Sequence, residues 1–181
     1  MSIAKAYRQL PAASRQRGLP SIGFEITPSD DLEVTPVPAG ETLLRCTETR
    51  DDGRPVGELE VTVFSAALVI DRDGILEAKA SDNTGGAHAV PVVLPGASGY
   101  FAETRGDEDL PYRCVFAIAP HDLAIDGGVL VTVRSARPEW PAADRVMQSL
   151  RIITRHGTAP ANDVAADAPL LPFVPPLRRD E

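Results

Sequence analysis

The sequence predicts an α+β fold: a mostly antiparallel β-sheet of about six or seven strands, with a C-terminal helix packed on one face and extended termini. Residues 112–119 are apolar on both faces and rich in aromatic and branched side chains, which is typical of a strand covered on both sides. Residues 129–134 alternate, with their valines on one side, and residues 141–150 change to a helical period. The apolar positions of that helix are Ala143, Val146, Met147 and Leu150.

The connections within this unit carry turn and cap signals. Asp126-Gly127-Gly128 is expected to supply the positive-φ residues of a tight reversal between the two strands. Pro138 or Pro141 suits the first turn of the helix, where a missing N–H costs nothing, and Glu139 and Asp144 suit its positive end. Because an antiparallel pair followed by an amphipathic helix can bury itself, we expect this unit to form the core.

A hairpin is expected earlier in the chain. Residues 41–50 and 56–65 flank the turn cluster 51–55, whose sequence is DDGRP. The second strand has one apolar and one polar face, so one face is expected to be buried and the acids on the other solvated. The two sets are Leu59, Val61 and Val63, and Glu58, Glu60 and Thr62. Before the hairpin, residues 21–27 predict a short strand, and residues 32–40, with two prolines, predict an extended edge or connector.

The middle of the chain is less distinctive. Residues 66–70 remain apolar, and Asp71-Arg72-Asp73-Gly74 leads into residues 75–80. This pattern fits either another hairpin or a short helix, and we prefer the hairpin. Residues 88–94 and 99–103 predict two short strands around a Pro-Gly turn, and Pro91 makes the first of them an edge strand.

Composition divides the 181 residues into three parts. We expect an N-terminal helical or docking segment at 1–19, an α+β core domain at 20–153 and a Pro/Ala-rich tail at 154–181. The first part is weakly amphipathic, and a disordered lead or a transit peptide are the alternatives to a docking helix. Its apolar side holds Ile3, Ala6, Tyr7 and Leu10.

The charge balance bears on the class of partner. The chain has 18 Lys and Arg against 26 Asp and Glu, a net charge of −8, which argues against nucleic acid or an anionic membrane surface as principal partner. No apolar run approaches the roughly 18 residues that a membrane span needs. The first residues lack the apolar stretch of a secretory signal, so we expect a cytoplasmic protein. Cys46 and Cys114 are then expected to be reduced, small core residues.

No combination of residues predicts chemistry. The histidines His88, His121 and His156 lie far apart, and neither they nor the cysteines have metal-ligand spacing. Asp71-x-Asp73-Gly74 resembles the start of a calcium loop, but the later ligand positions do not fit, so we interpret it as a turn. We therefore expect no catalytic, cofactor-binding or metal-ligating residues.

Trp140, the only tryptophan, lies between Glu139 and Pro141 at the expected helix start. We interpret it first as a staple that fixes the helix on the sheet. The alternative is an exposed anchor for a partner, a role in which tryptophan is over-represented.

Several segments between about residues 90 and 153 follow a shared pattern. They are Val92 to Tyr100, the strand Tyr112 to Ala119, the strand Val129 to Ser135, and the helix Ala142 to Gln148 running into Ser149-Leu150-Arg151-Ile152-Ile153. This order resembles the PsbP-like group of small α/β-sandwich domains, which includes LpqN-type lipoproteins and DcrB-like proteins. Such proteins are generally non-enzymatic accessory, adaptor or binding modules, so the resemblance implies no catalytic residues. The sequence departs from the lipoprotein members in having no signal or lipobox.

We therefore expect a non-catalytic accessory or structural subunit that binds protein partners, as a homo-oligomer or within a larger cytoplasmic assembly, through its termini. The alternative is a domain that carries a small molecule or lipid in an apolar pocket between sheet and helix. An enzyme would require His121 to meet a carboxylate in a cleft. The expected partner-binding residues are Tyr7, Leu10, Trp140, Leu170, Leu171, Phe173, Val174 and Leu177.

Overall fold

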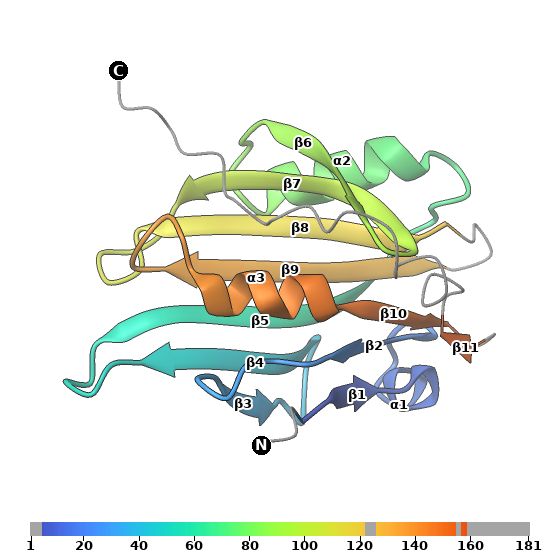
Figure 1. The fold of residues 1–181 in the computed structure, drawn as a ribbon. Helices are drawn as coiled ribbons and strands as arrows, with labels where there is room; N and C mark the ends of the chain where they lie inside the picture. Colours follow the sequence, from blue (N-terminus) through green and yellow to red (C-terminus); the bar gives the residue numbers. More distant parts are fainter. Residues whose placement is uncertain (1–4, 122–125, 155–156, 159–181) are drawn as a thin grey trace.

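The strands of the described residues form two antiparallel β-sheets (Figure 1). The computed structural model describes residues 5–121, 126–154 and 157–158. Within them the elements are β1 (Tyr7–Gln9), α1 (Pro11–Gln16), β2 (Ile22–Ile26), β3 (Glu33–Pro36), β4 (Thr42–Thr49), β5 (Pro55–Ser65), α2 (Arg72–Asp82), β6 (Ala89–Leu94), β7 (Ala97–Arg105), β8 (Tyr112–Pro120), β9 (Gly127–Ser135), α3 (Pro141–Ser149), β10 (Arg151–Thr154) and β11 (Gly157–Thr158). The large sheet has the order β3-β4-β5-β9-β8-β7-β6, and the small sheet has the order β1-β2-β10-β11.

The centre of the large sheet is apolar on both faces, as the sequence predicts. In β8, Phe116 and Ile118 belong to one core cluster, and Val115 and Ala117 belong to the other. The alternation in β5 is also confirmed, because Leu59, Val61 and Val63 are fully buried. The predicted hairpin of β4 and β5 turns at Gly53, whose φ of 80° requires glycine. Mostly antiparallel sheet with a C-terminal helix is therefore the observed architecture.

The small sheet and α3 share one apolar cluster with the first face of the large sheet. Phe24 of β2, Val146 of α3 and Val131 of β9 are all within it. The predicted helical face of α3 is buried, and Pro141 occupies its first turn. In Figure 1, α3 lies in front of β5 and β9.

The N-terminal segment is part of this small sheet instead of a separate docking helix. Tyr7 of β1 pairs with Ile26 of β2 and packs against the core. The short helix α1 is held by the Ser14 hydroxyl, which donates to the carbonyl of Ile22 at 2.6 Å. The folded part of the chain therefore begins no later than Tyr7 and extends beyond the expected core of 20–153.

No helix among the described residues has both the length and the apolarity to cross a membrane.

On the second face, the expected hairpin after residue 70 is wrong, because residues 72–82 form the helix α2. The Asp71 side chain accepts a hydrogen bond from the Gly74 backbone N–H at 3.0 Å and caps the helix. Leu76 and Ala80, four residues apart, are fully buried against the sheet. The four apolar residues within 75–80 are compatible with a strand or a helix. The cap at Asp71 is the local feature that favours the helix.

The expected role of Gly127 and Gly128 as positive-φ turn residues is also wrong. Both lie in β9, and neither has a positive φ. A Cβ on Gly127 would lie 2.0 Å from the Phe64 carbonyl oxygen, and one on Gly128 would lie 2.7 Å from a Phe64 ring carbon. These glycines permit the close approach of β5.

Candidate functional site

Trp140 closes one end of the core and does not project as an anchor. Its side chain is only 3% exposed, and its ring lies flat against Gly57 of β5. The indole Nε1–H donates to the Glu48 carboxylate on β4 at 2.6 Å. Trp140 is also the residue directly before α3. The staple interpretation is therefore the one that the contacts support.

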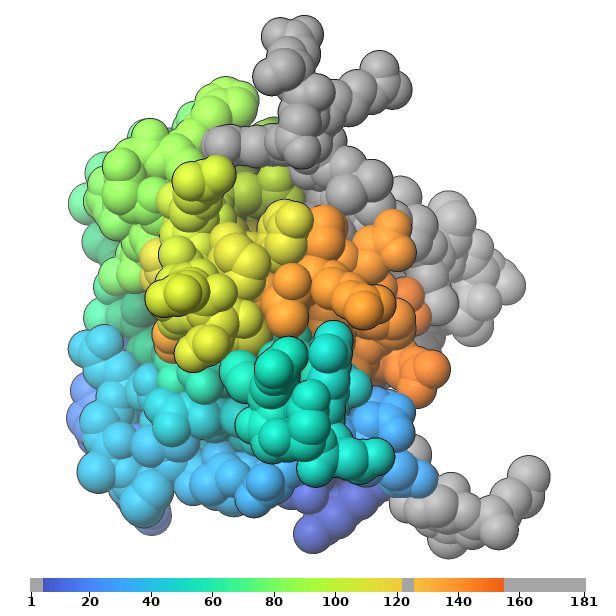
Figure 2. Space-filling model, turned by 90° about the vertical axis from the view of Figure 1, so that its left-hand side faces the viewer, coloured from blue at the N-terminus to red at the C-terminus, as the bar shows by residue number. Residues whose placement is uncertain are grey.

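A cavity of about 530 Å³ lies beside this tryptophan. Figure 2 views this end of the molecule, where the β4–β5 turn, in teal, lies beside the orange segment that leads into α3. The lining is Asp31, Glu48, Arg50, Val56, Ala136, Arg137, Glu139, Trp140, Pro141, Ala142 and Arg145. Six of these side chains are charged, three of each sign. Such a lining suits a polar or zwitterionic group and not an apolar ligand.

One corner of the protein exposes branched apolar side chains. Val69 and Ile70, in the loop before α2, are 67% and 80% exposed, and Val93 of β6 is 64% exposed. Arg72, two residues after Ile70, donates from Nη2 to the carbonyl of Ser98 at 2.9 Å, and Ser98 pairs with Val93 across β6 and β7. This contact brings the loop and the end of β6 to the same corner. We call Val69, Ile70 and Val93 the corner patch.

Arg72 fixes the backbone that presents the corner patch. Its Nη2 also donates to the carbonyl of Ala119 at 2.7 Å, so one guanidinium joins the start of α2 to both β7 and β8. Its side chain is largely buried. The guanidinium of Arg72 is thus directed inward and holds the backbone of the corner, while the side chains of the corner patch are exposed to water.

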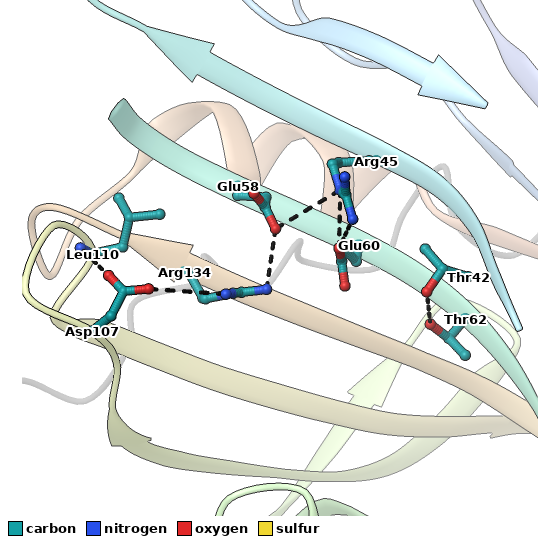
Figure 3. A network of polar contacts seen from close by, with 8 residues as sticks. All are labelled: Thr42, Arg45, Glu58, Glu60, Thr62, Asp107, Leu110 and Arg134. Atoms are coloured by element: carbon teal, nitrogen blue, oxygen red, sulfur yellow. Dashed lines mark hydrogen bonds and ion pairs between the residues drawn. The ribbon is translucent and has the colours of Figure 1, made fainter. Parts of the chain in front are cut away.

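A charged network covers the second face over β4 and β5 (Figure 3). Glu58 lies between Arg45, at 3.9 Å, and Arg134, at 3.1 Å. Arg45 also pairs with Glu60 at 2.6 Å, and the hydrogen bond with Glu60, followed by its charge, raises the pKa of Arg45. Asp107 accepts from the Leu110 backbone N–H at 2.8 Å and lies 4.0 Å from Arg134.

This network corrects the interpretation of Glu58 and Glu60 as merely solvated. The hairpin register alone places Arg45 opposite Glu60, so the turn cluster could have revealed that pair. The Arg134 contact could not have been found without the order of the strands. Because each carboxylate lies within 4.0 Å of a guanidinium, the network organises a polar surface.

The two cysteine thiols are buried and not activated, and the two described histidines lie at the surface. Cys46 and Cys114 are free and buried, as expected of small core residues. Burial raises the pKa of Cys46 to about 12, and burial followed by the charges of Glu103 and Asp144 raises the pKa of Cys114. Both thiols therefore remain protonated at neutral pH. His88 and His121 are exposed, and His156 lies outside the described residues.

The other expected partner-binding residues have different positions. Tyr7 is half-buried in β1, and Leu10, just before α1, is 52% exposed. The tail residues lie outside the described residues: Leu170, Leu171, Phe173, Val174 and Leu177. The corner patch was missed, because the exposure of Val69 and Ile70 depends on α2 beginning at Arg72.

Comparison with known proteins gives no relative for this chain: no family model, no curated protein and no solved structure matches it.

Proposed function

We propose that this protein is a non-catalytic accessory subunit that binds a partner protein through the corner patch. The observation that carries the proposal is that three branched apolar side chains at one corner are each at least 64% exposed. Clustered apolar exposure on a folded domain typically marks an interaction surface. Arg72 supports this role, because it holds the patch on a fixed backbone and lowers the entropy lost on binding.

A protein partner suits the geometry better than an apolar small molecule. The space between the large sheet and α3 is filled by buried side chains such as Phe116, Val131 and Val146. The cavity beside Trp140 has a charged lining. Neither feature favours a lipid-carrying pocket between sheet and helix.

The two thiols favour the cytoplasm as the place of action. Both are free and buried, which suits a reducing compartment. With their pKa values raised, neither would serve as a nucleophile, which supports an accessory role over an enzymatic one.

The proposal is tested by capture of partners from the native cell with the tagged full chain. We compare the wild type with the triple variant Val69→Ser, Ile70→Ser, Val93→Ser. Each lost apolar contact weakens binding by about 1 kcal/mol, so recovery of the partner should fall at least about tenfold. Leu10→Ser is the matched control, because it removes one exposed apolar side chain from the N-terminal segment.

Circular dichroism verifies that each variant folds. Equal recovery with the triple variant contradicts the proposal, as does a wild-type chain that captures nothing. Loss of the partner with Leu10→Ser alone would instead favour docking through the N-terminal segment. If the partner is a second copy of the chain, light scattering shows a dimer that the triple variant converts to a monomer.

A further inference from the structure

Each face of the large sheet is covered over only part of its width by the described elements. On the first face, α3 and the small sheet lie over the side that contains β5 and β9. On the second face, α2 contacts β6, β7 and β8 (Figure 1). Among the described residues, no element therefore covers two areas: the second face of β4–β5 and the first face of β6–β7.

The two areas differ in chemistry. The β4–β5 area presents the Arg45, Glu58 and Glu60 network, which water solvates well. The β6–β7 area presents Val90, Val92, Leu94 and Phe101, which alternate onto the first face through the pairs Val90↔Phe101 and Leu94↔Ala97. Val90 is 38% exposed, and the other three are only partly buried. We call these four residues the β6–β7 surface; an apolar sheet face of this kind normally has a cover.

The chain itself continues for 23 residues beyond Thr158, from 159 to 181. Thr158 ends β11 of the small sheet, which lies on the first face. The 12 residues from Thr158 to Leu170 span at most about 40 Å when extended, enough to cross the sheet. Residues 170–177 (LLPFVPPL) then place five apolar side chains between prolines, a sequence that favours an extended peptide bound through its side chains.

Charge is complementary at the same place. Arg178 and Arg179 follow the apolar segment directly. Glu103 of β7 pairs with Cys114 of β8 on the first face. Glu103 comes two residues after Phe101 in the same strand, so its carboxylate lies on the same face, at the edge of the β6–β7 surface.

We infer that residues 170–177 dock onto the β6–β7 surface of their own chain, with Arg178 and Arg179 directed toward the carboxylate of Glu103. The tail then completes the domain and is not a docking peptide for a partner. This inference is independent of the corner patch, which belongs to the second face.

Photo-crosslinking in the full chain tests it. A benzophenone amino acid replaces Phe173, and after irradiation the crosslinked peptides are identified by mass spectrometry. We expect crosslinks within the monomer, most of them to residues 88–105. The same probe at Ala165, in the stretch before the segment, is the control and should give several-fold fewer crosslinks to these residues. Crosslinks between chains, to another part of the domain, or equal from both positions overturn the inference.

Dye binding gives a second, independent measurement. The double variant Leu171→Asp, Phe173→Asp should bind anilinonaphthalene sulfonate several-fold more strongly than the control Ala161→Asp, Ala165→Asp, because the β6–β7 surface loses its cover. Both variants carry the same added charge. Equal dye binding by the two variants contradicts the inference.

Discussion

Replacing Gly57 by alanine is expected to displace the indole of Trp140. A Cβ on Gly57 would lie 2.5 Å from Cδ2 and 2.6 Å from Cε2 and Cε3 of the ring, whereas ordinary contact begins at 3.4 Å. The ring would have to withdraw by about 1 Å. The 2.6 Å hydrogen bond to Glu48 would then lengthen to about 3.5 Å, beyond useful range.

The size of the loss follows from these two effects. Overpacking a filled site costs about 1–3 kcal/mol, and losing a hydrogen bond to a charged group costs about 1.5–3 kcal/mol. Since part of the strain relaxes as the ring moves, we expect the free energy of unfolding to fall by about 2–4 kcal/mol. Urea unfolding followed by far-ultraviolet circular dichroism measures it.

A double-mutant cycle isolates the contact. In a Trp140→Ala background, Gly57→Ala no longer meets the ring and should stabilise the strand by about 0.5–1 kcal/mol. The coupling free energy between the two sites should therefore exceed about 2 kcal/mol. If the two changes are additive to within about 0.5 kcal/mol, the stapling role of Trp140 is refuted.

Three further predictions concern the described residues. Asp144→Asn should raise the free energy of unfolding by about 1 kcal/mol at pH 7, after allowance for solvent screening, and by nothing near pH 4. The reason is that burial, followed by the charge of Glu139, raises the pKa of Asp144 to about 6 in the folded protein. Ionisation of this carboxyl therefore destabilises the folded state as the pH rises from 4 to 6. An increase in the free energy of unfolding that is equal at pH 4 and pH 7 contradicts this reasoning. Asp71→Ala should cost about 1 kcal/mol by removing the cap of α2, while Asp82→Ala at the other end of α2 should cost nothing; equal losses in urea unfolding would show that the cap is unimportant. The two buried thiols should resist a thiol reagent at pH 8 in the native protein and react in urea, and rapid native labelling would be evidence against their burial.

The elements with a strong local signal could be predicted from sequence. The alternation of Leu59, Val61 and Val63 defines the buried face of β5, and the DDGRP turn defines its pairing with β4. The spacing of Val146, Met147 and Leu150 defines the buried face of α3. In each case the periodicity and the turn or cap residues indicate the same structure, so the prediction of the element needs no information about distant segments.

The features that sequence did not reveal depend on distant contacts. Strand β2 pairs with β10, more than 120 residues later, through four residue pairs, and short strands at such separation have little local signal. The contact of Trp140 with Gly57 and Glu48 likewise cannot be predicted unless the order of the strands is known. The corner patch follows from the cap at Asp71, which fixes where α2 begins and leaves the preceding loop exposed.

Hydrogen exchange of the full chain, alone and in its complex from the native cell, tests the proposed role of the corner patch most directly. Binding at the corner predicts slower amide exchange at residues 66–71 and 93–98 in the complex, with the charged β4–β5 face unchanged. Protection confined to β3 and β4, or an identical exchange pattern in both states, would contradict it.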